Sequence, residues 1–303
     1  MSLATWYQRY EQWQGLDRAL QHSPAQAWFR SRAATRLAVL CYHGIEDASA
    51  FEAQLERLTR IASPVSLRQV EAAVHEGRPL PPRSVLLTFD DGDRSLYVDG
   101  LPLLRAYGVP AVAYVVAGLI GTDEPFWWEG LSDELGHAVK QVPDAERRRM
   151  LAELPVRPRR QQLSAEELRE LVDGGVAVGS HTLTHPCLDR CEGAAVEREI
   201  EDAHRLLTGF LGVAPTSFAY PNGNFDPRAD RRLASLGYRT GFLCDHRLTA
   251  PGLQHALRLS RLRVSTLTTP ARFETVLSGL QPAVFRTGRG AVSALRRVRA
   301  VGR

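Results

Sequence analysis

The sequence predicts an α/β protein whose parallel strands form an open sheet or a barrel. Two observations support this fold class. Along most of the 303 residues, short apolar segments rich in β-branched residues alternate with segments of helical periodicity. Several apolar segments also end abruptly in polar residues, and parallel α/β folds collect their functional groups at the carboxyl ends of the strands.

The composition is that of an ordinary globular protein. Hydrophobic residues make up 44% of the chain and charged residues 24%, which excludes a disordered or fibrous protein. The net charge of +4 is mild. No stretch approaches the roughly 18 consecutive apolar residues of a membrane-spanning helix. Residues 1–36 contain no apolar stretch of signal-peptide length, so we expect a cytoplasmic protein.

The chain has four cysteines, which are Cys41, Cys187, Cys191 and Cys244. None of them belongs to a Cys-x-x-Cys pair, and Cys187 and Cys191 are isolated from other soft ligands. The spacing does not favour a zinc site, so we expect reduced thiols.

The first 35 residues are expected to form a helical extension. Aromatic and aliphatic residues recur there at helical spacing, at Trp6, Tyr10, Trp13, Leu16 and Leu20. The extension either packs on the main domain or forms a loosely attached arm. The first clear strand follows at 37–42 and ends at His43-Gly44. A histidine at a strand end is usually structural, but it gains interest if other strand ends are also polar.

The most informative stretch is Val85–Phe89 followed by Asp90-Asp91-Gly92. Its apolar residues predict a buried strand, which follows a helix at 50–61. Neighbouring residues at a strand end point in different directions. Asp90 and Asp91 could therefore share one site with different roles, one on a metal and one on a proton. The alternative is an ordinary turn, because Asp-Asp-Gly is also common turn chemistry.

A helix at 95–107 and a strand at 111–116 continue the alternation. Residues 118–163 interrupt it and are expected to form an insertion beside the main fold. The insertion contains two adjacent tryptophans, Trp127 and Trp128. Their rings could form a platform on which a sugar stacks, or they could anchor the insertion to the core.

The alternation resumes with a helix that opens on the capping box Ser164–Glu167, and with a strand at 176–180. That strand leads directly into His181-Thr-Leu-Thr-His185. Two histidines four residues apart can bind one ion from a helical turn or a tight loop, and imidazole is a common zinc ligand. A purely structural pair is the alternative.

The remaining elements are helices at 194–211 and 226–236, strands at 217–220, 240–244 and 259–264, and a closing helix at 270–280. A tight turn, Pro221-Asn222-Gly223, follows the strand at 217–220. We therefore divide the chain into an extension at 1–35, a main domain at 36–280 and a tail at 281–303.

The tail is rich in arginine and has apolar residues spaced for one helical face. It could contact an anionic membrane surface or remain a solvated helix. No other feature favours nucleic acid, so we expect no nucleic-acid partner.

Three motifs, Thr88–Gly92, His181–His185 and Phe218–Gly223, resemble those of the polysaccharide deacetylases of carbohydrate esterase family 4, the nodulation-deacetylase homology domain. Their order and approximate separations also match, and the resemblance covers about residues 36–280. The Phe-Ala-Tyr-Pro sequence of the third motif resembles one subgroup. The resemblance implies a distorted (β/α) barrel with seven strands that binds a divalent metal, usually Zn²⁺.

The resemblance also implies a role for each matching residue. Asp91, His181 and His185 would bind the metal. Asp90 would act as the general base. Three protein ligands leave room for a water and for the acetamide carbonyl. A backbone N–H, matching Asn222 in this chain, would stabilise the oxyanion.

Two positions depart from the family pattern. Ala219 replaces the arginine that often orients the base, and Arg261 is a candidate for the missing charge. The last motif lacks the histidine that serves as general acid, which leaves His43 and His246 as candidates. His43 is preferred because Tyr-His at the first strand end also resembles the subgroup. The candidates for substrate binding are Tyr220, Trp127, Trp128 and His246.

These features predict a metal-dependent N-deacetylase that removes acetyl groups from an N-acetylated amino sugar in a polysaccharide or glycan precursor. The alternative is a catalytically weak module that binds metal and glycan but lacks an acid. A glycosidase that used Asp90 with a distant carboxylate would leave the histidine pair unused. A lipid-linked sugar would suit a cytoplasmic enzyme whose basic tail reaches the inner membrane surface.

Overall fold

The computed structural model describes residues 14–155, 157–249 and 255–286. Its centre is a parallel sheet with the strand order β7-β6-β5-β4-β3-β1-β8, and β2 pairs with β3 beside this path. The strands are β1 (Ala38–Tyr42), β2 (Ser63–Pro64), β3 (Ser84–Phe89), β4 (Ala111–Val115), β5 (Val176–Ser180), β6 (Ser217–Ala219), β7 (Thr240–Phe242) and β8 (Leu262–Arg263). A parallel bridge from Phe242 to Leu259 brings the segment before β8 back beside β7. The predicted α/β barrel is therefore confirmed.

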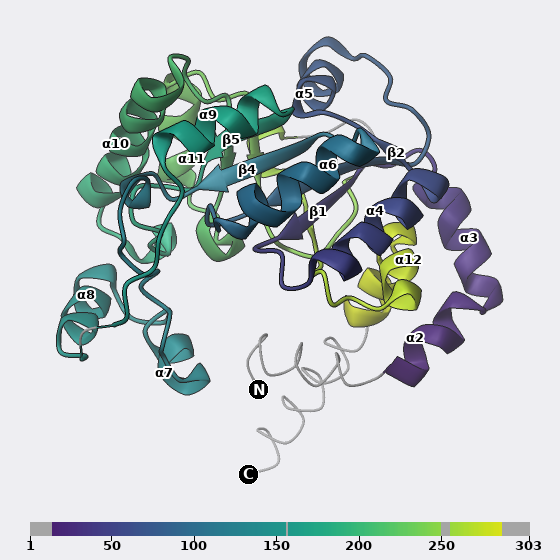
Figure 1. Cartoon of the computed structure of the whole chain (residues 1–303), viewed down its shortest axis with the longest axis horizontal. Helices are drawn as coiled ribbons and strands as arrows, with labels where there is room; N and C mark the ends of the chain where they lie inside the picture. Colours follow the sequence, from purple (N-terminus) through teal and green to yellow (C-terminus); the bar gives the residue numbers. More distant parts are fainter. Residues whose placement is uncertain (1–13, 156, 250–254, 287–303) are drawn as a thin grey trace.

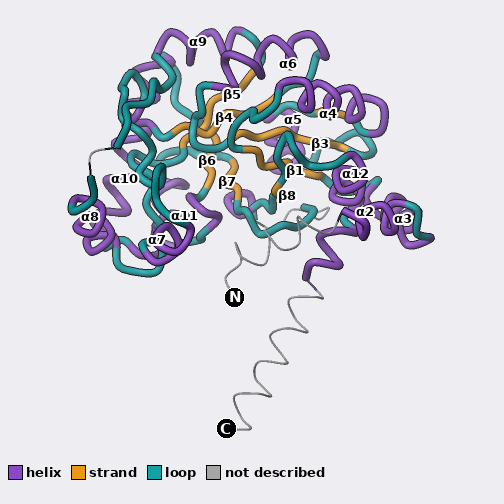
Figure 2. Tube along the Cα trace, turned by 60° about the horizontal axis from the view of Figure 1, so that its bottom comes forward, coloured by secondary structure: helices purple, strands orange, loops and turns teal. Residues whose placement is uncertain are grey.

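Helices surround the strands (Figures 1 and 2). They are α2 (Gln14–Gln21), α3 (Pro24–Ala33), α4 (Ala48–Ile61), α5 (Leu67–Glu76), α6 (Leu101–Tyr107), α7 (Asp133–Ala138), α8 (Asp144–Ala152), α9 (Ala165–Asp173), α10 (Gly193–Leu211), α11 (Pro227–Ser235) and α12 (Pro270–Ser278). The predicted helix at 95–107 begins with a π-helical turn, Leu96–Gly100, before α6. Its apolar periodicity does not distinguish the two kinds of turn.

Between residues 62 and 83 the sequence patterns predict no element, whereas the structure contains β2 and α5. Helix α5 opens on a capping box, because the Ser66 hydroxyl accepts from the Gln69 N–H and the Gln69 side chain accepts from the Ser66 N–H. Its Leu67 and Val70 pack on the apolar cluster inside the barrel. The capping-box residues Ser66 and Gln69 and the apolar Leu67, Val70 and Val74 are all visible in the sequence, so this helix could have been predicted from it.

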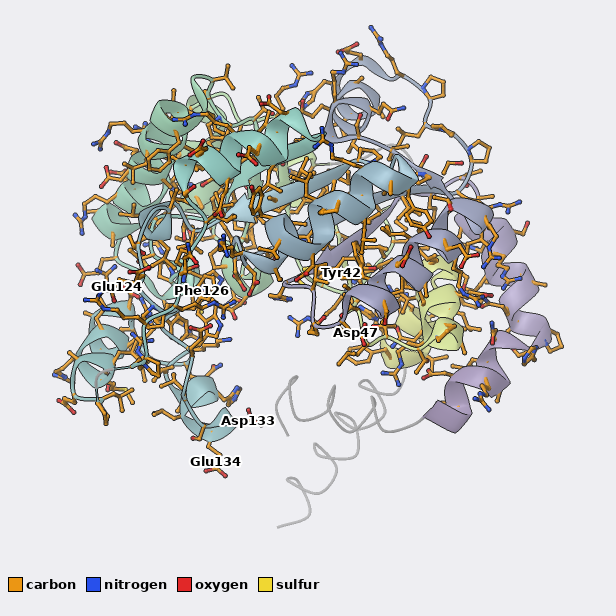
Figure 3. The ribbon with its side chains drawn as sticks, viewed as in Figure 1. Tyr42, Asp47, Glu124, Phe126, Asp133 and Glu134 are labelled. Carbon is orange, nitrogen blue, oxygen red and sulfur yellow. The ribbon has the colours of Figure 1, made fainter. Side chains whose placement is uncertain are left out.

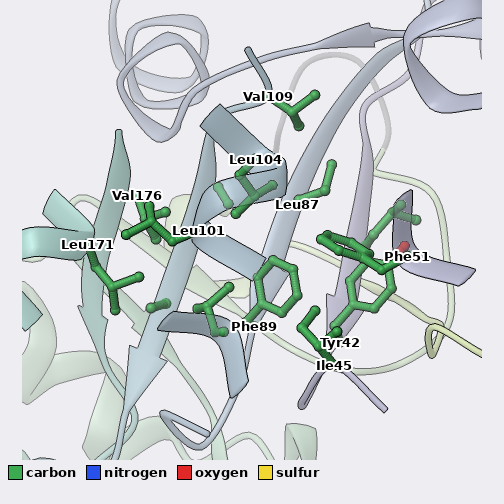
Figure 4. Packing of buried hydrophobic residues seen from close by; sticks show 14 of the residues in the cluster. Tyr42, Ile45, Phe51, Leu87, Phe89, Leu101, Leu104, Val109, Leu171 and Val176 are labelled. Carbon is green, nitrogen blue, oxygen red and sulfur yellow. The ribbon is translucent and has the colours of Figure 1, made fainter. Parts of the chain in front are cut away.

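The larger apolar cluster lies between the outer face of the sheet and helices α4, α6 and α9. The Tyr42 ring stacks on the Phe89 ring with 5.1 Å between centroids, and Phe51 meets both rings edge-on (Figure 4). Aromatic contacts of this kind contribute beyond their buried area. They fix β1, β3 and α4 next to the strand ends that carry His43 and Asp90.

The N-terminal helices pack on the end of the main domain. Asp17 of α2 accepts a hydrogen bond from Arg272 of α12 at 2.9 Å, and both side chains are buried. Gln26 of α3 accepts from Ser278 at 2.8 Å. Figure 1 shows α2 and α3 beside α12. For residues 14–33, packing on the main domain is therefore the correct alternative.

Helices α7 and α8 extend from one side of the barrel, and Figure 3 places Asp133 and Glu134 at the far end of this segment. Within the described ranges, no helix has the length and apolar character needed to cross a membrane. Most of the predicted basic tail, 287–303, lies outside the described residues.

We predict that Gly179→Ala in β5 destabilises the protein. A Cβ at this position would lie 2.4 Å from the Tyr114 ring and 2.8 Å from the Ser217 carbonyl oxygen, so the buried strands would have to separate. The expected loss in the free energy of unfolding is about 1–3 kcal/mol, measured as a lower urea midpoint. Gly209→Ala in α10 is the control, since its Cβ would have no atom within 4 Å. A control that loses as much stability would contradict the packing argument.

Candidate metal centre and active site

The polar residues predicted at the strand ends converge at one end of the barrel. Asp90 follows β3, and its N–H donates to Tyr42 O of β1 at 2.9 Å. His181 follows β5, and its N–H donates to Val115 O of β4 at 3.0 Å. Each hydrogen bond extends a parallel ladder by one residue. The side chains at this edge are thus held by the sheet itself.

Asp91, His181 and His185 form a buried cluster that could hold a metal ion. Asp91 Oδ1 lies 3.4 Å from His181 Nε2 and 3.3 Å from His185 Nε2. One ligand atom from each residue lies within 4.8 Å of the other two. A carboxylate oxygen and two imidazole nitrogens form a donor set that suits zinc and other first-row divalent metals.

The surroundings of this cluster fit a cation. Asp91 Oδ1 is buried and has no hydrogen-bond partner among the described residues, although a buried carboxylate oxygen needs one. His181 Nδ1 donates to Ala219 O at 2.8 Å, so Nε2 keeps its lone pair and faces Asp91. A metal between the three ligand atoms would satisfy the carboxylate that the protein leaves unpaired.

The backbone at this site adopts uncommon conformations. Among the described residues, six that are not glycine have positive φ, and four of them are site residues or lie between the two histidines. These four are Asp91 (φ 70°), Thr182 (φ 70°), His185 (φ 59°) and Asn222 (φ 56°). Such conformations cost of order 1–3 kcal/mol each and concentrate at functional sites. The fold therefore spends stability on the placement of these side chains.

Glu199 of α10 fixes the loop from His181 to His185 through hydrogen bonds. The Glu199 carboxylate accepts from the N–H groups of Leu183 at 3.0 Å and Thr184 at 2.8 Å. Within the loop, Thr182 Oγ1 accepts from the His185 N–H at 3.0 Å. Burial raises the pKa of Glu199, although its hydrogen bonds with Thr184 and the nearby Arg148 charge oppose this effect.

Asp90 is bound by Arg261, which approaches from the segment before β8. Arg261 Nη1 and Nη2 donate to the two carboxylate oxygens of Asp90 at 2.5 and 2.7 Å. Nη1 also donates to Thr88 Oγ1, and Nε donates to Leu243 O at 2.9 Å. Arg261 is fully buried. This bidentate pair is the arrangement expected of a charge that orients the carboxylate.

The two aspartates remain ionised for different reasons. Burial opposes ionisation of Asp90, but the charges of Arg261 and His181 outweigh it and lower the Asp90 pKa to about 2. Burial likewise raises the pKa of Asp91. There the close approach of the His181 ring and the charges of His185 and His43 produce a net downward shift of the Asp91 pKa.

The two histidines also differ. Burial lowers the pKa of His185 to about 3 despite the attraction of Asp91, so this imidazole is neutral near pH 7. Burial also disfavours the charged form of His181, but Asp90 and Asp91 raise its pKa overall. A metal would have to displace any proton held by His181.

The other predicted site residues are distributed around this cluster. His43 is exposed at the end of β1. Asn222 is half-buried, and its side-chain amide donates to Cys187 Sγ at 3.2 Å. Gly223 is required next to it, because φ is 74° and a Cβ would lie 2.5 Å from the Cys244 nitrogen. The predicted tight turn is thus pressed against the loop after β7.

The tryptophans of the insertion have separate positions. Trp127 is buried, and its indole N–H donates to His185 O at 3.0 Å. This contact agrees with the alternative that a tryptophan anchors the insertion to the core. Trp128 is half-buried, stacks on Phe126 and lies 4.5 Å from the His185 ring between centroids. Trp128 is therefore the tryptophan with ring surface beside the histidines.

Tyr220 and His246 are buried and have almost no accessible surface to offer a substrate. Tyr220 is fully buried, and its hydroxyl donates to Asp230. His246 is buried between Gln281 and the N–H of Arg263. The predicted substrate contacts of these two side chains are therefore not supported, nor is His246 as an acid. A polar residue after an apolar strand does not reveal whether it points into the site or into the core.

Two residues near the site carry no signal in the sequence. One is Glu199, an ordinary position within an acidic and basic helix. The other is Lys140 of the insertion, whose Nζ lies 5.9 Å from the centroid of the Trp127 ring. Burial lowers the Lys140 pKa. Neither has a motif spacing that could have identified it.

Comparison with known families agrees with this geometry. A family model described as polysaccharide deacetylase matches residues 77–241, which is more than half of the chain. The chain belongs to the polysaccharide deacetylase family. The matched region includes both aspartates and both histidines, whereas His43 and Arg261 lie outside it. The family prediction is confirmed, and so is the predicted enzyme class, a hydrolase of carbon-nitrogen bonds other than peptide bonds.

Several curated proteins are similar in sequence. The putative polysaccharide deacetylase YxkH of Bacillus subtilis is 22% identical over 79% of this chain and 75% of its own length. The poly-beta-1,6-N-acetyl-D-glucosamine N-deacetylase of Staphylococcus aureus strain MSSA476 is 32% identical over 67% of this chain and 62% of its own length. The Escherichia coli K12 enzyme of the same name matches over only 59 residues, which is 9% of its length.

Two solved structures share the fold. The deacetylase PplD of Streptococcus pyogenes superposes with a TM-score of 0.62 at 19% identity, over 80% of this chain and 98% of that one. IcaB from Ammonifex degensii superposes with a TM-score of 0.61 at 24% identity, over 82% of this chain and 97% of that one. The parallel barrel described above is therefore shared with both structures, of which PplD is named a deacetylase.

We predict that Glu199→Ala weakens the affinity for a divalent metal by about 10- to 100-fold, because the loop between the histidines loses the carboxylate that holds it. Isothermal titration of the metal-free protein measures this change. Glu197→Ala, at an exposed position of the same helix, is the control and should bind the metal as the unchanged protein does. Equal affinity of both variants would show that Glu199 does not position the loop.

Proposed function

We propose that the protein is a metal-dependent N-deacetylase that hydrolyses the acetamide of an N-acetylated amino sugar and releases acetate. The observation that carries this proposal is the juxtaposition of a three-residue metal-ligand cluster with a separate, arginine-bound carboxylate. Asp91 Oδ1 faces the two imidazoles, while both oxygens of its neighbour Asp90 face Arg261. A binding site for metal alone would not need the second carboxylate.

In this proposal Asp91, His181 and His185 hold the metal, with Zn²⁺ as the preferred ion for this donor set. When bound, the metal would polarise the acetyl carbonyl and lower the pKa of the attacking water. The protein supplies an anionic carboxylate and a neutral imidazole at His185, both of which are ready to bind without first losing a proton.

Asp90 is the proposed general base. Arg261 uses one lone pair on each carboxylate oxygen, and the Cys41 thiol uses another on Oδ2. Oδ1 therefore keeps the lone pair that can accept a proton from water. Arg261 also keeps the carboxylate charged at every pH above about 2. A base with so low a pKa gives its proton up easily. We therefore propose that Asp90 passes the proton onward during the reaction.

Two further residues complete the proposed chemistry. His43 is the proposed general acid for the leaving amino group, because it is an accessible imidazole at the end of β1, next to the strand that carries Asp90. The backbone at Asn222, in its left-handed conformation, is the proposed donor to the oxyanion. The proposed metal ligands and Asp90 contact one another. His43 and Asn222 instead follow two other strands, β1 and β6.

The proposed substrate is a glycan that contains N-acetylglucosamine. The Staphylococcus aureus and Escherichia coli relatives are named for poly-β-1,6-N-acetyl-D-glucosamine, which favours this class. Trp128 has half-buried ring surface beside His185, where a sugar could stack. A lipid-linked precursor at a membrane surface is a narrower version of the proposal that rests on the arginines of residues 281–303 alone.

Asp90→Asn is expected to lower acetate release by about 10²- to 10⁴-fold, the usual contribution of a general base. Metal affinity should stay within a few-fold, because Asp90 is not among the proposed ligands. The measurement is acetate release from oligomers of β-1,4- and β-1,6-linked N-acetylglucosamine with added zinc.

Asp99→Asn, on the π-helical turn after this loop, serves as the control for the loss of a nearby carboxylate. If Asp90→Asn and the unchanged protein release acetate equally, Asp90 is not the base. If neither releases acetate although both bind zinc, the protein is instead a weak or inactive metal- and glycan-binding module.

Arg261→Met should shift the acidic limb of the kcat/KM profile to higher pH by roughly 1–3 pH units, because the strongest charge that opposes the effect of burial on the Asp90 pKa would be lost. Arg261→Lys should shift it less, since a charge remains. In the unchanged protein, the pair's contribution to stability is complete above about pH 4. It is lost only as the pH falls through about 2, the folded-state pKa of Asp90. Superimposable pH profiles of all three proteins would contradict the positioning role of Arg261.

A further inference from the structure

Two cysteines lie in contact behind the proposed base. The Cys244 thiol donates to Cys41 Sγ at 3.7 Å, and the Cys41 thiol donates to Asp90 Oδ2 at 3.4 Å. Cys41 is fully buried, whereas Cys244 is half-buried. The two residues are 203 positions apart in the sequence. Their spacing therefore gives no hint of the pair, and the sequence analysis expects only reduced thiols.

The closure of the barrel brings the two sulfurs together. Cys41 belongs to β1 and pairs in register with Arg263 of β8. Cys244 comes two residues after β7. The residue between them, Leu243, donates its N–H to Leu259 O in the segment before β8. The two thiols thus meet across the segment that contains Arg261. Cys41 is thus placed by the sheet, and Cys244 lies two residues after the end of β7.

Cys244 also supports the turn that contains Asn222. A Cβ on Gly223 would lie 2.5 Å from the Cys244 nitrogen and 2.9 Å from its Cβ. Cys244 therefore touches the Pro221–Gly223 turn on one side and Cys41 on the other. A movement of Cys244 would reach both the proposed base and the proposed oxyanion donor.

The alternative is that both thiols are ordinary packing residues, as most buried cysteines are. The charges around Cys244 argue against this alternative. Its sulfur lies 3.8 Å from Arg263 Nη2. The positive charges of Arg263 and Arg261 favour the thiolate form of Cys244. A half-buried cysteine whose sulfur lies beside guanidinium groups is the kind of cysteine that reacts with oxidants.

We propose that Cys41 and Cys244 are a redox-active pair that forms a reversible disulfide with hydrogen peroxide, and that this bond lowers the activity of the adjacent site. The effect on activity rests on the proposed deacetylase function, whereas formation of the bond does not. Cys244 is the attacking thiol because its residue is the less buried of the two and its sulfur lies beside Arg263. Cys41 is the resolving thiol because it lies behind it, in contact.

The reaction balances in two steps. The Cys244 thiolate attacks one peroxide oxygen, a sulfur–oxygen bond forms, the oxygen–oxygen bond breaks and hydroxide leaves, so that Cys244 becomes a sulfenic acid. The Cys41 sulfur then attacks the Cys244 sulfur, the sulfur–sulfur bond forms and the sulfur–oxygen bond breaks. The departing hydroxides take up the two thiol protons as water. Two thiols are oxidised and one peroxide is reduced.

The disulfide would change the site in two ways. The sulfurs would move from 3.7 Å to the bonded distance of about 2.05 Å. The Cys41 hydrogen that Asp90 Oδ2 accepts would be lost, and Cys244 would be drawn away from the turn at Gly223. Displacements of about 1 Å at a catalytic site can lower rates by about 100-fold. A thiol reductant would restore both thiols and the original geometry.

The experiment treats the full-length, zinc-loaded protein with hydrogen peroxide, quenches with catalase, blocks free thiols and digests without reductant. Mass spectrometry should find the peptide containing Cys41 linked to the one containing Cys244. Acetate release should fall by about 10- to 100-fold and return after dithiothreitol. Cys244→Ala should show the same activity before and after peroxide. Cys191→Ala, which removes a buried thiol elsewhere, should stay as sensitive as the unchanged protein.

Absence of the linked peptide would overturn the proposal, and so would a linked peptide with unchanged activity. Equal loss of activity in Cys244→Ala would show that peroxide acts at another group, which also overturns it. If the reduced protein releases no acetate from any oligomer, the proposed function fails. The linked peptide would in that case still establish the redox-active pair.

Discussion

The buried ion pair between Asp90 and Arg261 is the interaction on which the rest of the site depends. Burying either charge alone would cost several kcal/mol. Removal of one partner would therefore leave the other as an unpaired buried charge and destabilise the protein. The pair joins the end of β3 to the segment before β8, and the same guanidinium also binds Leu243 O beside β7. The same arginine therefore contributes both to the closure of the barrel and to the placement of the proposed base.

The same constraint separates the roles of two adjacent carboxylates. Asp90 continues the extended strand and turns toward Arg261, whereas Asp91 adopts a left-handed backbone with φ of 70° and faces the histidines. One carboxylate is neutralised by a permanent cation of the protein. The other, whose Oδ1 has no protein hydrogen bond among the described residues, is left for a cation from outside. The two side chains point in different directions because the backbone leaves the extended conformation of the strand at Asp91.

Much of this arrangement can be predicted from the sequence because strand ends are local features. Apolar runs that stop at Asp90 and at His181 identify both the strands and the edge at which they meet. Arg261 is harder, because its role depends on a contact across 171 positions, although a missing charge at Ala219 gives a reason to look for a substitute. Tyr220 and His246 illustrate the limit. Their strand-end positions resemble the others, but the packing of α11 and of the chain after β8 turns them inward.

The most direct test of this account is a crystal structure of the zinc-bound protein with acetate. We expect zinc at about 2.0–2.2 Å from Asp91, His181 and His185, acetate at the open side of the metal, and Asp90 still bound through both oxygens to Arg261. A structure in which Asp90 leaves Arg261 to become a zinc ligand, or in which zinc binds elsewhere, would contradict the division of roles between the two aspartates.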